Sequence, residues 1–558
     1  MRKWYQKPMA FLTAAVCLFA GGAIGFQDSL PQLQLTAEAE DKIYTGESDE
    51  LQLEYEELDD GTVEITKFVS STSTDIELPS VIDGKSVTSI AYSAFDVEVV
   101  ETCINLTSII IPDSVTSIGD YAFYKCTSLT DVTIPDSVTS IGKGVFYNCT
   151  SLTDITIPDS VTSIENAVFY NCTSLTEIIV DSNNKSYASN DGILFDKSFE
   201  TIICYPGGKA GNFTISDSVT IIGNGAFECC EKLTSVMIPD SVINIGHSAF
   251  YNCTSLTDVT ISNSVTRIEG GTFSDCTNLT SVTIPGSVMS IGYETFSGCT
   301  NLTSITIPDS VTSIGDYALE GCTDLIDITI PDGVTIIGNG AFVDCTNLTS
   351  VIIPANVTSI GDGTFGGCTS LTEIIVDSNN KSYVSKDGIL FNKDMGNIIC
   401  YPGGKTGSFI IPDSVTSIED DAFQNCTSLT DVTIPKSVTS IGDSAFYNCT
   451  NLTDIIIPDS VTNIGVGSFE RCTSLISVII PDSVTSIEYR AFYDCTSLTD
   501  VTIPDSVTSI GYEAFNDCDS LTDIYYKGTE SEWNQISIDS SAIPSNVTIH
   551  YESEPVTT

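Results

Sequence analysis

The sequence predicts a β-rich solenoid, a fold in which each short repeat forms one coil and neighbouring coils share a continuous core. Cysteines recur every 23 residues, and two gaps of 58 residues divide them into three groups that mark about 16 units. Apolar pairs such as Val132-x-Ile134 recur at the same interval, as expected of strands with one buried face. Proline follows most of these pairs and limits the strands to a few residues. The ladder cysteines are residues 103, 126, 149, 172, 230, 253, 276, 299, 322, 345, 368, 426, 449, 472, 495 and 518.

Residues 1–39 are expected to form a signal peptide. Arg2, Lys3 and Lys7 give a positively charged start, and residues 8–26 form an uncharged, largely apolar run that ends in small residues. This run approaches the roughly 20 residues that span a bilayer, so a retained N-terminal anchor is the alternative. Residues 40–75 are then expected to form an N-terminal cap, and no membrane insertion is expected after signal cleavage.

Each unit divides into segments with distinct physical roles. Val132 and Ile134 should point inward from a short strand, and the apolar pair Val138 and Ile141 should line a second face. Gly142 is expected to permit a tight turn. The segment around Ala122 and Phe123 is expected to be irregular or a single helical turn. Aspartates after the prolines fit ordinary turn chemistry, although stacked carboxylates could also attract a divalent cation.

Two long turns, residues 177–213 and 373–409, interrupt the repeat. Their sequences are near copies at an offset of 196 residues, which indicates that a whole block was duplicated. The solenoid is expected to cover residues 76–520 and to end in a C-terminal cap over residues 521–551, with a short tail at 552–558. Open solenoid ends expose core and strand edges, so we expect Trp533 to plug the C-terminal end.

The repeat also supports a resemblance to a known family. The pattern I-P-x-S-V-T-x-I-G-x-x-A-F-x-x-C-x-x-L-T resembles the BspA-like leucine-rich repeats of bacterial secreted and surface proteins. The segments from Leu53 to Lys67 and from Ile524 to Trp533 resemble the opening and closing segments of that family. The resemblance implies a leucine-rich repeat right-handed superhelix, a secreted or cell-surface location in a bacterium, and adhesion to host or community surfaces.

Composition excludes several functions. The chain has 74 acidic and 21 basic residues and a formal net charge of −53, so nucleic acid and anionic membranes are not expected as partners. His247 and His550 are its only histidines, which leaves little material for a catalytic triad or a zinc site. Motifs such as G-x-S-x-G and H-E-x-x-H are absent. We therefore expect a monomer with no enzymatic activity, cofactor or metal.

The ladder cysteines admit three interpretations. Adjacent coils would bring equivalent cysteines within disulfide range, but their parallel Cβ vectors argue against bridging. Zinc is disfavoured because no C-x-x-C pair or histidine accompanies them. We favour buried free thiols that act as small apolar side chains. Cys229, beside the ladder residue Cys230, is interpreted as a surface substitution, with a reactive thiol as the alternative.

Two surfaces are candidates for binding. The first is the row of residues between the two inward apolar positions of each strand, and the second is a set of tyrosines that directly follow the buried Phe. Each has a structural alternative: the threonines suit β-strands and solubility, and the tyrosines cover the neighbouring coil. The strand residues are Thr133, Thr156, Thr260, Thr283, Thr306, Thr329, Thr433 and Thr502, interrupted by isoleucines such as Ile110 and Ile352; the tyrosines are Tyr124, Tyr147, Tyr170, Tyr251, Tyr447 and Tyr493.

These observations lead to a functional hypothesis. We expect a secreted or surface-exposed protein that binds or adheres to extracellular or host-surface proteins or glycans. A passive structural spacer and an accessory protein that docks on polysaccharide are the alternatives.

Overall fold

The structure, a computed structural model, describes residues 42–46, 51–96 and 101–552. The chain divides into two units, Met1–Lys42 and Ile43–Thr558, and the first lies outside the described residues apart from Lys42. The signal-peptide prediction for residues 1–39 therefore falls outside the described part of the chain, as do residues 553–558 of the tail. In the described ranges, no helix is long and apolar enough to cross a membrane.

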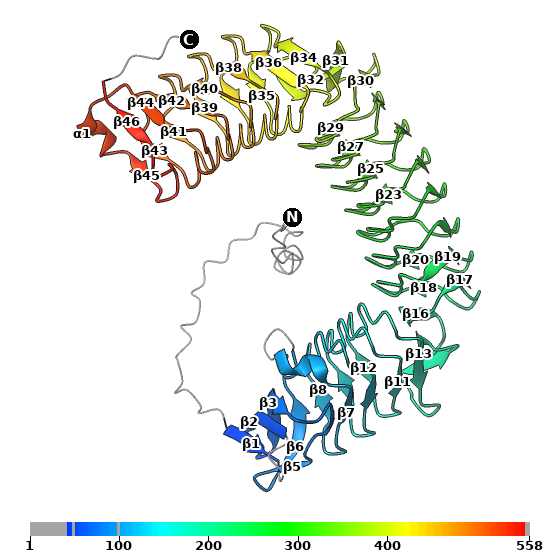
Figure 1. Cartoon of the computed structure of the whole chain (residues 1–558). Helices are drawn as coiled ribbons and strands as arrows, with labels where there is room; N and C mark the ends of the chain where they lie inside the picture. Colours follow the sequence, from blue (N-terminus) through cyan, green and yellow to red (C-terminus); the bar gives the residue numbers. More distant parts are fainter. Residues whose placement is uncertain (1–41, 47–50, 97–100, 553–558) are drawn as a thin grey trace. The chain divides into compact units, whose positions relative to one another are not determined.

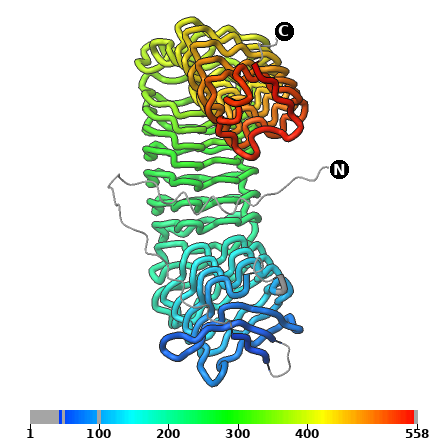
Figure 2. The backbone as a smooth tube through the Cα atoms, turned by 90° about the vertical axis from the view of Figure 1, so that its left-hand side faces the viewer, coloured from blue at the N-terminus to red at the C-terminus, as the bar shows by residue number. Residues whose placement is uncertain are grey.

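The predicted solenoid is confirmed. Figures 1 and 2 show successive coils stacked side by side through the second unit. There are about 21 coils, more than the 16 units marked by cysteines. Coils without a ladder cysteine account for the difference, because each long turn adds one coil in which Tyr205 or Tyr401 takes the place of the buried Phe, and the chain ends add others.

Two ladders of short parallel strands follow the stack. We call the first the threonine face, after the side chains that it exposes. Its strands are β4 (Asp75–Glu77), β7 (Ser108–Ile110), β9 (Asp131–Thr133), β11 (Asp154–Ile157), β13 (Glu177–Val180), β17 (Gly211–Thr214), β19 (Leu233–Met237), β21 (Asp258–Thr260), β22 (Ser281–Thr283), β24 (Ser304–Thr306), β26 (Asp327–Thr329), β28 (Ser350–Ile353), β30 (Glu373–Val376), β34 (Gly407–Ile410), β36 (Leu429–Thr433), β38 (Asp454–Ile456), β40 (Ser477–Ile479), β42 (Asp500–Ile503), β44 (Asp523–Tyr526) and β46 (Thr548–His550).

The second ladder, the serine face, runs along another side of the coils. Its strands are β3 (Val63–Ser71), β6 (Lys85–Ile90), β8 (Ser117–Ile118), β10 (Ser140–Ile141), β12 (Ser163–Ile164), β16 (Thr201–Cys204), β18 (Ile221–Ile222), β20 (Asn244–Ile245), β23 (Ser290–Ile291), β25 (Ser313–Ile314), β27 (Ile336–Ile337), β29 (Ser359–Ile360), β33 (Asn397–Cys400), β35 (Ser417–Ile418), β37 (Ser440–Ile441), β39 (Asn463–Ile464), β41 (Ser486–Ile487), β43 (Ser509–Ile510) and β45 (Ser537–Ile538).

The remaining elements lie at the ends and in the long turns. At the N-terminal end, β2 pairs antiparallel with β3, and a short 3₁₀ helix precedes β7. At the C-terminal end, Trp533 is buried and its ring meets Tyr526 edge-on at 5.1 Å. These elements are β1 (Lys42–Thr45), β2 (Leu51–Glu57), β5 (Val81–Ile82), η3 (Glu101–Asn105), α1 (Glu530–Trp533) and the hairpin strands β14 (Tyr187–Asn190), β15 (Ile193–Asp196), β31 (Tyr383–Lys386) and β32 (Ile389–Asn392).

The third side of each coil is irregular, as expected. Its backbone N–H groups donate to the next coil, for example from Phe123 to the Val145 carbonyl at 2.9 Å. The residue that precedes the ladder cysteine, such as Asn148, has a positive φ, so this segment cannot continue as a helix. The turn after the proline is also confirmed, because the Val138 N–H donates to the Pro135 carbonyl at 3.1 Å.

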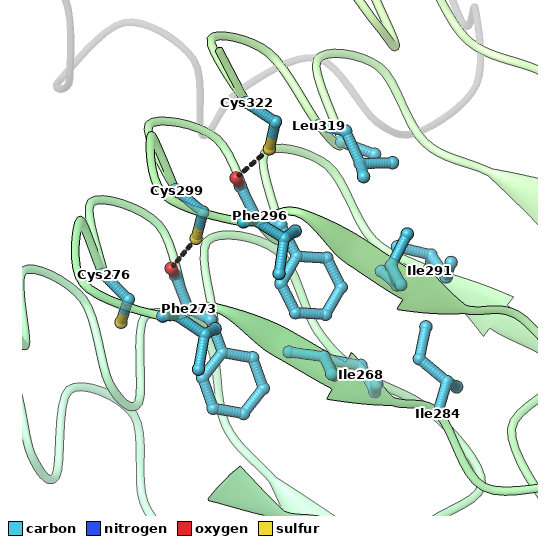
Figure 3. Packing of buried hydrophobic residues seen from close by; sticks show 14 of the residues in the cluster. Ile268, Phe273, Cys276, Ile284, Ile291, Phe296, Cys299, Leu319 and Cys322 are labelled. Carbon is cyan, nitrogen blue, oxygen red and sulfur yellow. Dashed lines mark hydrogen bonds between the residues drawn. The ribbon is translucent and has the colours of Figure 1, made fainter. Parts of the chain in front are cut away.

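Repeated polar side chains satisfy carbonyl groups of the preceding coil. The Cys299 thiol donates to the Phe273 carbonyl at 3.1 Å, and Cys322 repeats the contact with Phe296 at 3.3 Å (Figure 3). Ser160 Oγ donates to the Val138 carbonyl at 2.7 Å. All 19 cysteines in the described residues are free, and burial raises the pKa of the Cys299 and Cys322 thiols. The interpretation as buried free thiols is confirmed, with the added role of hydrogen-bond donor.

The two long turns divide the buried core into three clusters. In the first hairpin, β15 places Leu194 in the preceding cluster, whereas Ile193 and Phe195 belong to the following one. Strand β32 repeats this division with Leu390, Ile389 and Phe391. Alternate side chains of a strand point to opposite faces, so each hairpin lies between two stretches of coil and contributes to both.

The role expected of Gly142 differs from the one observed. Its φ is not positive, and a Cβ atom at this position would lie 2.7 Å from the Asp120 nitrogen. Glycine is therefore required by the close approach of the neighbouring coil rather than by a special turn conformation.

We predict that Gly142→Ala lowers the free energy of unfolding by about 1–3 kcal/mol, and with it the thermal midpoint. The added methyl group must displace backbone atoms of the neighbouring coil. Gly286→Ala is the matched control, since nothing lies within 4 Å of its Cβ position. Thermal unfolding followed by circular dichroism measures both, and equal midpoints for the two variants would contradict the prediction.

We also predict that the ladder thiols react with Ellman's reagent at least about tenfold more slowly in the native protein than in the unfolded chain, because they are buried. Burial also raises the pKa of thiols such as that of Cys299, which lowers the fraction of reactive thiolate. The measurement uses the full chain with Cys17→Ser, since Cys17 lies outside the described residues. Rapid labelling of many thiols under native conditions would show that the reagent reaches them in the folded protein and would contradict the prediction.

Candidate functional site

The threonine face exposes the predicted row of side chains. Thr283 and Thr306 occupy register-matched positions on β22 and β24, and the exposed residues of this row are Thr133, Thr156, Thr260, Thr283, Thr306, Thr329 and Thr433. Large apolar residues interrupt the row, and Ile410 and Ile456 are both 73% exposed. The prediction is wrong for Thr502, which is only 2% exposed between Ile479 and Tyr525 on the paired strands.

Three of the six predicted tyrosines come together. The rings of Tyr124 and Tyr147 lie 5.2 Å apart, and Tyr147 stacks on Tyr170 at 4.1 Å. Tyr121 contacts both Tyr124 and Tyr147, and Tyr92 meets Tyr121 edge-on at 6.0 Å. We call these five residues the tyrosine cluster. Its rings follow successive coils of the first stretch of the solenoid.

Mutual stacking leaves most of the tyrosine cluster half-buried. Burial raises the pKa of Tyr147 and Tyr170, so both hydroxyls stay protonated at neutral pH. The Lys125 ammonium lies 5.0 Å from the Tyr124 ring centre, within cation–π range. The rings therefore cover the neighbouring coils, as the structural alternative states, and also present an ordered aromatic edge.

The tyrosine cluster ends at the first long turn, next to Cys229. Tyr170 hydrogen-bonds the Cys229 sulfur, and Asn252 Nδ2 donates to the same atom at 3.6 Å. Cys229 is buried, and burial raises its pKa to about 11. Its interpretation as a surface substitution is therefore wrong. The neighbouring Glu228 is half-buried, and desolvation raises its pKa to about 8.

The other three tyrosines stand apart from the tyrosine cluster. Tyr251 hydrogen-bonds Asp275. Tyr447 accepts a hydrogen bond from Arg471 Nη1 at 2.8 Å, and Arg490 lies 4.6 Å from the Tyr493 ring centre. These arginine contacts were not predicted from the sequence, because arginine occupies different positions in the two units. The structure therefore places the predicted tyrosines at several separate sites along one edge.

Metal-ligand geometry is lacking in the part of the chain that the structure describes. No group of three or more His, Cys, Asp or Glu residues in these ranges could hold a metal ion. The aspartates that follow the prolines, such as Asp136, are exposed in their turns.

The chain is similar to bacterial leucine-rich repeat proteins. The model of the BspA-type leucine-rich repeat region matches residues 88–203, 197–299, 272–387 and 394–522. A leucine-rich cell-surface protein from Faecalibacterium prausnitzii is 30% identical, and the alignment covers 90% of this chain and 100% of that one with a TM-score of 0.39. A leucine-rich repeat protein from Bacteroides ovatus is 24% identical over 90% and 98% of the two chains, with a TM-score of 0.32. The pneumococcal vaccine antigen PcpA is 18% identical over 92% and 94%, with a TM-score of 0.33. No curated protein matches the sequence.

We predict that Glu228→Gln flattens part of the pH dependence of stability. The pKa of Glu228 is raised in the folded state, so its protonated form favours folding and stability falls as pH rises from its unfolded value, about 4.3, to about 8. The variant should raise the unfolding midpoint at pH 8.5 and leave it unchanged at pH 4. Glu231→Gln, at an exposed position, is the control. Parallel pH profiles for wild type and Glu228→Gln would contradict the assignment.

Proposed function

Because the chain belongs to the BspA-type leucine-rich repeat family, we propose that it is a non-catalytic binding protein, secreted or held at the bacterial surface, that adheres to extracellular or host-surface proteins or glycans. The family membership supports a binding scaffold as the general role. The leader-like residues 1–39 support export. The charge of −53 favours partners that are not polyanions.

The tyrosine cluster is the observation that supports this function most directly. Tyrosine supplies a large contact area and a hydroxyl group, and it is enriched among residues that dominate binding energy. Stacking at 4.1 Å between Tyr147 and Tyr170 holds the rings before any partner arrives. A surface that is already ordered loses less side-chain entropy on binding.

The threonine face supports the second candidate, docking on a polysaccharide. Thr283 and Thr306 repeat one hydroxyl at the strand spacing, so this face offers similar contacts on neighbouring coils. An extended polymer with its own repeat would suit such a surface. A passive spacer is the third candidate, and it requires neither surface.

Side-chain replacement on the two surfaces separates these candidates. We predict that Tyr124→Ala, Tyr147→Ala and Tyr170→Ala together weaken binding to immobilised matrix proteins or mucin by at least about tenfold, whereas the corresponding Tyr→Phe variant, which keeps the rings, retains most of it. Biolayer interferometry with the full chain measures the affinity.

The matched control replaces Thr260, Thr283 and Thr306 with alanine on the other surface. Loss of binding in this variant alone would transfer the function to the threonine face. A wild-type chain that binds no matrix protein, mucin, glycan or cell would contradict the proposal. The passive spacer would then be the remaining candidate function.

A further inference from the structure

A groove of about 380 Å³ crosses the serine face of the first coils. Glu64, Ser117 and Ser140 line it. They belong to a cross-strand row in which Glu64, Ser89, Ser117, Ser140 and Ser163 are register-matched on β3, β6, β8, β10 and β12. Four strand spacings make this row about 19 Å long. The volume lies within the range of small-ligand sites, roughly 300–1,000 Å³.

Both hydroxyl and carboxylate groups line the groove. The side chains of Ser117 and Ser140 lie in the lining, and their hydroxyls can each donate and accept a hydrogen bond. Glu64 accepts from Ser89 Oγ at 2.9 Å near one end, and Glu165 accepts from Ser163 Oγ at 3.1 Å near the other. Both carboxylates keep capacity to accept further hydrogen bonds.

An aromatic ring stands at the rim of the groove. Tyr92 is 67% exposed, and its edge contact with Tyr121 fixes the ring beside the opening. The face of an aromatic ring carries partial negative charge and attracts weakly positive C–H groups. No Lys, Arg or His lines the groove, so phosphate and sulfate groups find no counter-charge there.

We propose that this groove binds a neutral, hydroxyl-rich glycan, with a sugar ring against Tyr92 and sugar hydroxyls hydrogen-bonded to Ser117, Ser140 and the Glu64 and Glu165 carboxylates. A pyranose ring presents C–H groups on its faces and hydroxyls that donate and accept at its edge, which matches these groups. The inference rests on the proposed function, because it assigns one ligand class to a binding protein.

A basic peptide fits the groove less well. Lysine and arginine side chains only donate hydrogen bonds, so they would leave the donor capacity of the two serine hydroxyls unused. The carboxylates are also partly engaged, since the Asp120 carboxylate accepts from the Lys143 N–H at 2.8 Å and the glutamates accept from serines.

Isothermal titration of the full chain with cellohexaose, laminarihexaose, maltohexaose, chitohexaose and yeast mannan tests the proposal. We expect at least one of these glycans to bind, and we expect Tyr92→Ala and the double variant Ser117→Ala/Ser140→Ala each to weaken that binding at least tenfold. Tyr293→Ala is the matched control, because Tyr293 follows Ile291-Gly292 as Tyr92 follows Ile90-Ala91. The neighbouring coil on the serine face carries Arg267 there. The Tyr293→Ala variant should bind like wild type.

Three outcomes would overturn the inference. These are the absence of binding to every glycan, glycan binding that neither groove variant weakens, and binding of decalysine but not of the glycans. If the chain binds a matrix protein or mucin through the tyrosine cluster but binds no glycan, this inference fails and the proposed function stands. If it binds nothing, both fail.

Discussion

Hydrogen bonding between consecutive coils, repeated at each coil, is the constraint on which the structure depends. A coil of 23 residues cannot pair all of its own backbone N–H and C=O groups. Neighbouring coils must therefore supply the missing hydrogen-bond partners. Two strand ladders meet part of this demand, and the residues of the irregular third side meet more through their own N–H groups. Ladder thiols add a donor from the next coil, as in the contact from Cys149 to the Phe123 carbonyl, which also accepts the Cys126 N–H. The repeat is therefore fixed by polar contacts as much as by the apolar positions.

Much of the fold could be predicted from the sequence because the 23-residue interval between equivalent residues gives the length of one coil. Val132 and Ile134 point inward as their alternation indicates, and Cys126 is buried as its position in the unit suggests. Gly142 shows the limit of this reasoning. Glycine is required there by the close approach of the preceding coil's backbone, and that distance cannot be read from the sequence. Cys229 shows another limit, since its burial depends on Tyr170 and Asn252 from other coils.

The candidate sites were harder to predict for the same physical reason. Threonines on the strands are exposed by simple alternation, but Thr502 is covered by neighbours whose size varies from coil to coil. Tyr124, Tyr147 and Tyr170 meet because three consecutive units carry the same residue, whereas Tyr447 and Tyr493 are separated by a unit with Glu470 at this position. The groove on the serine face combines residues from the N-terminal end and from ordinary units, and no single unit contains its pattern.

The hairpins in the long turns have a mechanical consequence. A stack with only nearest-neighbour contacts transmits load from coil to coil, and its weakest interface yields first. Strands β15 and β32 interrupt both faces, so the load passes there through interdigitated side chains such as Leu194 and Phe195 instead of a continuous ladder. The two hairpins therefore divide the solenoid into three stretches, which a pulling force would unfold in separate steps.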